Sequence, residues 1–195
     1  MQAVAQEEAA VRDATAPASP ARVFVALKMA QDIAHALAEL ARPLEKFSVR
    51  PISPGDIHLT LVPPWAETAT EAAADRLRHA VEGCRAFTLE FRHLGYGPDP
   101  KRPRLLWVDC AMANELVELN AALVRVFGRP DDRPFRPHVT LARLRNNGRR
   151  IARQCPLDRE LTLMQAVTTV ELMQSPPPGA RGYRILASVP LVAVG

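Results

Sequence analysis

Long apolar runs are missing from this sequence. No stretch approaches the roughly 20 consecutive apolar residues that a bilayer-spanning helix needs. The N-terminus is acidic where a signal peptide is basic, and it lacks the apolar segment of such a peptide. We therefore expect a cytoplasmic protein without membrane contact.

Cysteine and histidine are scarce. The three cysteines, Cys84, Cys110 and Cys155, are widely spaced and form no C-x-x-C pair, which argues against a disulfide framework and against a zinc knuckle. We predict that they are small buried or half-buried side chains. The chain has only five histidines, so any repeated pattern among them is informative.

The overall composition is that of a folded protein. Of the 195 residues, 48% are apolar and 24% are charged, which excludes wholesale disorder. Residues 1–20 are rich in Ala, Glu and small polar residues and end in Pro-Ala-Ser-Pro, so we expect a flexible tail there and a single domain over residues 21–195. The net charge of +4 is mildly favourable to an anionic partner.

The chain repeats one order of elements. An apolar run at 22–27 predicts a strand, apolar residues spaced by three and four over 33–44 predict a helix, and a turn leads to His58. A strand at 104–110, a helix over 112–126 and a proline-rich turn lead to His138 in the same way. The distances are similar, 34 residues from Phe24 to His58 and 32 from Leu106 to His138, which favours a duplicated unit. Further helices are expected near 67–84 and 148–155, and further strands near 87–91, 161–173 and 183–193.

The tetrad His-x-Thr-Leu occurs at residues 58–61 and again at 138–141, at matching places in this repeat. Successive side chains of a strand point to opposite faces, so each His shares a face with its Thr while the two apolar residues point into the core. Two such faces brought together supply an acid, a base and two hydroxyl donors. The ordinary pKa of His lies near 6.5, so one imidazole can take a proton while the other gives one, which suits attack on a phosphate ester.

Other readings of these residues remain open. The tetrads could be ordinary strand residues, although their matched positions argue against chance. The two histidines could also bind a metal ion, but no further His, Cys or carboxylate stands nearby at a spacing that suits metal ligands. Arg143 stands an odd number of positions from His138, so on a regular strand it would face away, and reaching a phosphate would require the strand to end or bulge. The basic stretch that follows, with Arg145, Arg149, Arg150 and Arg153, is either a solvated face or a contact for an RNA backbone.

The remaining histidines are expected outside the site. His35 and His79 lie in predicted amphipathic helices and are assigned to the surface, and His93 is assigned a structural place at a strand end.

Taken together, the two tetrads, the strand 102–108 and the run 133–143 resemble the two-histidine phosphoesterase superfamily, and within it the bacterial RNA 2′,3′-cyclic phosphodiesterases of the 2′-5′ RNA ligase family. The resemblance covers residues 22–193. It implies an α+β fold with two lobes related by a pseudo-twofold axis, in which two antiparallel-rich sheets face a central cleft and helices lie outside.

The resemblance also implies a reaction. A terminal 2′,3′-cyclic phosphate of RNA or of a nucleotide would be hydrolysed to a 2′-phosphate without a metal or another cofactor. His58 would be the proton donor, His138 the proton acceptor, and Thr60, Thr140 and Arg143 would bind the phosphate. We expect RNA ends or cyclic nucleotides as partners, no protein partner and a monomeric chain. An RNA-end binding module without turnover, and 2′-5′ ligation, are the alternatives.

One segment departs from the family pattern. Many relatives follow the first tetrad with a basic residue and an apolar-Gly turn, whereas Val-Pro-Pro-Trp follows here at 62–65. A basic contact is therefore expected to be missing on that side. Trp65 could stack on a base or pack in the core.

Overall fold

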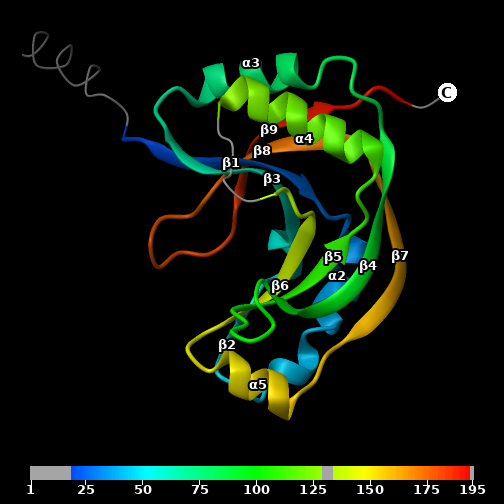
Figure 1. Ribbon diagram of the computed structural model, residues 1–195. Coiled ribbons are helices and arrows are strands. Elements are labelled where there is room, and N and C mark those ends of the chain that lie inside the picture. The colour runs from blue at the N-terminus through cyan, green and yellow to red at the C-terminus, as the bar shows by residue number, and fades with distance from the viewer. Residues whose placement is uncertain (1–18, 129–133, 194–195) are drawn as a thin grey trace, which may run out of the picture.

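The computed structural model describes residues 19–128 and 134–193 of the chain (Figure 1). The tail expected over residues 1–20 lies almost entirely outside these ranges. The described elements are β1 (Ala21–Lys28), α2 (Gln31–Glu39), β2 (Val49–Pro51), β3 (His58–Glu67), α3 (Thr70–Ala80), β4 (Phe87–Gly97), β5 (Leu105–Cys110), α4 (Asn114–Phe127), β6 (His138–Leu144), α5 (Gly148–Gln154), β7 (Arg159–Val167), β8 (Thr169–Gln174) and β9 (Arg184–Pro190), with short 3₁₀ helices at Arg42–Leu44 and Pro54–Asp56.

Within these ranges the strands form one nine-stranded sheet in which all neighbouring strands are antiparallel. The order is β7-β4-β5-β6-β3-β1-β8-β9, and β2 pairs with β6 beside this path. The prediction of an α+β fold built on antiparallel strands is confirmed.

The sheet consists of two matching halves. From the centre outward, one half runs β3-β1-β8-β9 and the other runs β6-β5-β4-β7. The two meet where β3 pairs with β6 through Leu59 and Val139, the second residues of the two tetrads. The pseudo-twofold axis therefore passes between these two residues. We expected two separate sheets, whereas this central pair joins the halves into one hydrogen-bonded path.

The helices pack across the two halves. Helix α2 follows β1 but contacts β7 of the other half, and α4 follows β5 but contacts β3. Helices α3 and α4 lie side by side over β8 and β9 at one end of the molecule, and α5 lies at the other end (Figure 1). This exchange ties the halves together through one core, to which β1 contributes Val23, Val25 and Leu27. Phe24 and Ala26 are buried on the other face of β1, in a smaller cluster with Met173.

Two predicted elements are divided in the structure. The helix expected to reach Leu44 ends at Glu39, because Pro43 lacks the N–H that would continue it, and a 3₁₀ turn still buries Leu44 completely. The strand stretch expected over 161–173 breaks at Thr168, where the chain passes from β7, paired with β4, to β8, paired with β1. Both parts are strands, so the apolar pattern of the sequence continues without a break. It therefore does not show that the chain changes from one half of the sheet to the other.

The three cysteines carry no disulfide. Cys110 is buried, and Cys84 and Cys155 are half-buried, as predicted.

Candidate active site

The two tetrads lie on adjacent strands at the centre of the sheet. Leu59 and Val139 are opposite one another and fully buried. In an antiparallel pair the flanking residues then face each other crosswise, so His58 lies across from Thr140 and Thr60 lies across from His138. All four polar side chains are half-buried and share the face opposite Leu59 and Val139.

These side chains line a pocket of about 290 Å³. The volume is near the lower limit of ordinary ligand pockets, which suits the end of a substrate better than a large ligand. The full lining is Ile52, Asp56, His58, Thr60, Pro98, Leu105, Trp107, His138, Thr140, Arg143 and Tyr183. The structure thus brings together all five residues that the sequence singled out.

Both histidines are held by the same backbone contact. The Nδ1 of His58 lies 2.7 Å from the carbonyl oxygen of Asp56, and the Nδ1 of His138 lies 2.8 Å from that of Arg136. A carbonyl oxygen only accepts hydrogen bonds, so Nδ1 carries the proton in each ring. Nε2 of each imidazole is then the ring nitrogen that is able to accept a proton.

Aromatic side chains surround His58. Its ring centroid lies 5.0 Å from that of Phe24 and 5.0 Å, edge-on, from that of Tyr183. Tyr183 is held in turn by its backbone N–H, which donates to the Asp56 carboxylate at 2.9 Å. Asp56 therefore fixes His58 through its carbonyl and Tyr183 through its side chain.

The pKa of His58 is lowered from its ordinary value. Burial is the main cause, because the charged imidazolium is poorly solvated among the aromatic rings. The hydrogen bond to the Asp56 carbonyl and the Asp56 charge oppose this effect, while the charges of Arg143 and His138 add to it. In the substrate-free protein His58 therefore gives up its proton more easily than an exposed histidine.

A polar clamp surrounds His138 instead. The Arg136 guanidinium donates from Nε and Nη2 to the two carboxylate oxygens of Asp109, at 2.9 and 2.8 Å, and lies 4.7 Å from the centroid of Trp107. The Trp107 ring is itself 4.4 Å from the His138 ring. Across β5 and β6, Asp109 pairs with His138 and Trp107 with Thr140. The clamp thus fixes the segment whose carbonyl orients His138.

A glycine makes room for the Trp107 ring. A Cβ built on Gly97, in the neighbouring strand β4, would overlap the ring carbons of Trp107. The ring therefore lies directly against the backbone, and a larger residue at position 97 would displace it.

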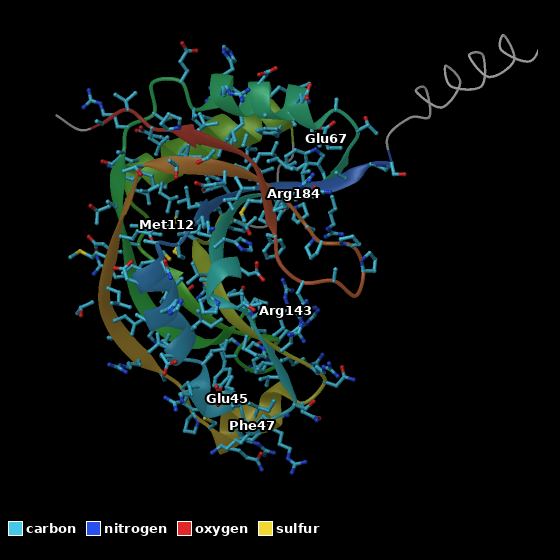
Figure 2. All side chains as sticks on the ribbon, turned by 180° about the vertical axis from the view of Figure 1, so that it is seen from behind. Glu45, Phe47, Glu67, Met112, Arg143 and Arg184 are labelled. Atoms are coloured by element: carbon cyan, nitrogen blue, oxygen red, sulfur yellow. The ribbon has the colours of Figure 1, made fainter. Side chains whose placement is uncertain are left out.

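A β-bulge turns Arg143 toward the pocket. Ala142 pairs with Leu106 but Thr140 pairs with Trp107, so Leu141 is an extra residue in β6. An extra residue reverses the alternation of faces beyond it. Arg143 thereby returns to the face of His138 and lines the pocket, and Figure 2 shows it beside the loop that joins β8 to β9.

The first tetrad has the same bulge with a different residue after it. Val62 pairs with Val25 but Thr60 pairs with Ala26, which makes Leu61 the extra residue. Position 63 therefore corresponds to position 143, and it holds a proline in place of an arginine. This register agrees with the expectation that a basic contact is missing after the first tetrad.

The other candidates lie elsewhere. Trp65 is buried against Phe127, with ring centroids 5.0 Å apart, so it packs in the core rather than in the pocket. His93 binds the exposed Asp158 at 2.6 Å, away from the pocket lining. His35 and His79 are exposed on helices, as predicted.

Some residues in and around the pocket were not predicted from the sequence. Tyr183 lies 125 residues from His58 in a Pro- and Gly-rich loop that carries no motif. Trp107 and Asp109 alternate along β5, so a face assignment for that strand could have placed them beside the second tetrad.

Neither a cluster of metal-ligating side chains nor a membrane-spanning helix occurs among the described residues. No group of three or more His, Cys, Asp or Glu side chains there is arranged to hold a metal ion. No helix in the same ranges is both long and apolar enough to span a membrane.

A duplicated antiparallel α+β fold with paired His-x-Thr motifs on one pocket defines the class of two-histidine phosphoesterases. Residues 52–175 match the family model described as the 2′-5′ RNA ligase superfamily. The chain belongs to this superfamily, as its resemblance indicated.

Similar proteins agree with this assignment. A protein of Thermus thermophilus named RNA 2′,3′-cyclic phosphodiesterase is 31% identical over 63% of this chain and 68% of its own length. One of Aquifex aeolicus with the same name is 26% identical over 66% of this chain and 73% of its own length. The expectation of an enzyme related to these phosphodiesterases is thus confirmed.

Solved structures share the fold. The crystal structure of TT0787 from Thermus thermophilus superposes with a TM-score of 0.72 at 22% identity, covering 88% of this chain and 98% of that one. E. coli LigT complexed with NADP+ gives a TM-score of 0.67 at 24% identity, with coverages of 88% and 98%.

Proposed function

We propose that this protein hydrolyses the terminal 2′,3′-cyclic phosphate of RNA to a 2′-phosphate by two-histidine acid–base catalysis. The observation that carries the proposal is the pair of imidazoles, each with its Nδ1 held by a carbonyl, on one pocket with two threonine hydroxyls. The names of the relatives indicate the substrate.

The proposed reaction divides the work between the two histidines. His138 accepts a proton from water as the water oxygen bonds to phosphorus, and His58 donates a proton to the 3′ oxygen as the P–O3′ bond breaks. The products are a 2′-phosphate and a 3′-hydroxyl. Thr60, Thr140 and Arg143 donate hydrogen bonds to the non-bridging oxygens and hold the phosphorus in line with the attacking water. Imidazolium, hydroxyls and guanidinium handle the charge, so the reaction is proposed to need no metal.

The lowered pKa of His58 must be reconciled with its role as donor. A phosphodiester in the pocket carries a negative charge next to both imidazoles, and this charge favours the protonated form of His58. Its effect opposes those of burial and Arg143. We therefore propose that substrate binding favours protonation of His58, and that His58 donates this proton later in the reaction.

The same groups could serve ligation or simple binding. Ligation breaks the same P–O3′ bond, with the 5′-hydroxyl of a second RNA attacking phosphorus in place of water and with the same proton roles, and a binding module would recognise the phosphate without turnover. The family description names ligation, so a test must resolve all three outcomes.

The test is a product assay on an RNA oligonucleotide ending in a 2′,3′-cyclic phosphate, in EDTA, with separation of 2′- and 3′-phosphate products. We expect the 2′-phosphate from the wild type and almost none from His58→Ala or His138→Ala. His93→Ala, which changes a histidine outside the pocket, is the matched control and should react normally. An intact cyclic end, or full activity of His58→Ala, would refute the proposal. Joining of the end to an added 5′-hydroxyl RNA would favour ligation.

A further inference from the structure

A larger groove opens beside the proposed active site. It has a volume of about 770 Å³ and lies between the end of α2, strand β2 and the loop joining β8 to β9. It shares Ile52, Asp56, Arg143 and Tyr183 with the smaller pocket. The two are therefore continuous, and a substrate whose end occupies the pocket has room to extend into the groove.

The groove brings like charges together. Arg50 of β2 and Arg143 of β6 are direct register partners, and Arg145 and Arg181 line the same groove. Like charges directly opposite in an antiparallel pair are destabilising, and no ion pair to Arg50 or Arg143 occurs within the described ranges. An anionic ligand between them would relieve this repulsion.

The acidic residues of the groove do little to neutralise these arginines. Glu39 is paired with Arg42, and the Asp56 carboxylate, which accepts from the Tyr183 N–H, keeps its charge. Glu45, the third, lies well away from Arg143 in Figure 2. In the described lining next to the pocket, Asp56 stands against Arg50, Arg143, Arg145 and Arg181, so this part of the groove carries a net positive charge.

A second basic groove lies next to the first. It measures about 510 Å³, and no acidic side chain contributes to its described lining. Arg145 lines both grooves, so the two are adjacent. The charged residues of this second groove are Lys101, Arg102, Arg104, Arg145 and Arg149.

Backbone contacts fix the two segments that form the second groove. The Leu144 N–H donates to the Arg104 carbonyl at 2.7 Å. A Cβ on Gly148 would overlap the Pro103 carbonyl oxygen, so only glycine allows so close an approach. The arginines on either side are therefore presented from a fixed surface.

We propose that the nucleotides preceding the cyclic phosphate bind along a basic track from Arg143 through Arg145 to Arg104, so that the substrate is single-stranded RNA rather than a mononucleotide. The proposal rests on the proposed function for the identity of the bound end. It assigns part of the basic stretch, Arg145 and Arg149, to the phosphate backbone. Arg150 and Arg153 line neither groove.

The first arm of the test compares RNA substrates of one, two, four and eight nucleotides, each ending in a 2′,3′-cyclic phosphate. We expect kcat/KM of the wild type to rise with length. The double variant Arg104→Ala/Arg145→Ala should lose about 3- to 30-fold on the octanucleotide, since exposed ion pairs are individually weak. Its kcat/KM on the cyclic mononucleotide should not change. The matched control Arg22→Ala/Arg85→Ala removes two exposed arginines outside both grooves and should keep the length dependence.

The second arm measures binding without turnover. The probe is an RNA octanucleotide ending in a 3′-phosphate, and its Kd is followed against salt concentration. Each lost contact to a single-stranded phosphate lowers the slope of log K against log salt by about 0.7, so the track variant should lose about 1.4 relative to the wild type.

The two arms separate the two proposals. If no cyclic phosphate reacts but the track variant still shows a smaller salt slope than the wild type, the proposed hydrolysis is refuted and the track is not. Equal kcat/KM at all lengths, or an unchanged slope in the track variant, would overturn the track. Binding of the wild type to anionic lipid vesicles but not to the octanucleotide would also overturn it.

Discussion

The two halves of the site orient their histidines in the same way but support them differently. In each half a carbonyl two residues earlier accepts from Nδ1. His58 is then packed among aromatic rings, whereas the segment of His138 is fixed by an arginine–carboxylate pair on Trp107. The duplicated motif sets the geometry, whereas the surroundings differ, and burial among the aromatic rings lowers the pKa of His58.

Replacing either histidine should have the largest effect and should distinguish the roles of the two halves of the site. Loss of a general acid or base lowers rates by about 10²- to 10⁴-fold, so kcat of His58→Ala and of His138→Ala should fall by that amount. The residual activity of His58→Ala should lose the alkaline limb of the pH profile, and that of His138→Ala the acidic limb. Rate profiles between about pH 5 and 9 test this, because the ordinary pKa of a histidine side chain lies near 6.5. The opposite pattern of limbs would exchange the two roles.

Arg143→Gln should have the next largest effect. A hydrogen bond to a charged group contributes about 1.5–3 kcal/mol, so kcat/KM should fall about 10- to 100-fold. Pro63→Ala changes the corresponding position of the first half and should leave kcat/KM within about twofold, as for most surface substitutions. Similar losses in both variants would contradict the asymmetry of the site.

Two substitutions should move the pKa of His58 in opposite directions. The charge of Arg143 lowers it, so Arg143→Gln should raise it; the charge of Asp56 raises it, so Asp56→Asn should lower it. Asn retains an oxygen that accepts from the Tyr183 N–H, so the loop contact survives. An NMR titration of the His58 imidazole measures both shifts, and movement in the same direction would disprove this electrostatic account.

Breaking the clamp of the second half should act on kcat more than on KM. Asp109→Ala removes both hydrogen bonds of Arg136 and loosens the carbonyl that orients His138. Small misplacements of a catalytic group are costly, and we expect a fall in kcat of about tenfold. Asp75→Ala, which breaks the exposed pair with Arg78, is the control. A loss confined to KM would show that the clamp binds substrate instead.

The smallest effect concerns packing behind the second histidine. Gly97→Ala forces the Trp107 ring to move, and overpacking of about 1–3 kcal/mol corresponds to a Tm lower by about 3–10 °C in a protein of this size. Gly55→Ala precedes Asp56 in the first half and meets nothing within 4 Å, so its Tm should hardly change. Thermal denaturation followed by circular dichroism compares the two, and equal values of Tm would contradict the close packing of Trp107.

The sequence predicted the parts of the site that depend on local pattern. Period-two alternation placed His58 with Thr60 and His138 with Thr140, and the matched spacing indicated that the two tetrads belong together. Both inferences need only strand geometry.

What escaped prediction depends on long-range contacts or on a local irregularity. Regular alternation turns Arg143 away, and the bulge at Leu141 reverses this. The adjacent apolar residues Leu141 and Ala142 were the available signal, because both are buried where strict alternation would expose one. Nothing in the local sequence of Tyr183 connects it with His58, since the contact depends on the pairing of β8 with β1.

The twofold relation of the tetrads bears on which ester bond breaks. A 2′,3′-cyclic phosphate offers two leaving oxygens, O2′ and O3′, at almost equivalent positions on one phosphorus atom. A site with true twofold symmetry around Leu59 and Val139 would accept the ring in either orientation and would protonate either oxygen. Arginine at position 143 against proline at position 63 removes that equivalence, and under the proposed function we expect it to favour one orientation of the substrate. Under the proposed hydrolysis, the residue that follows each bulge therefore contributes to the regiochemistry of ring opening.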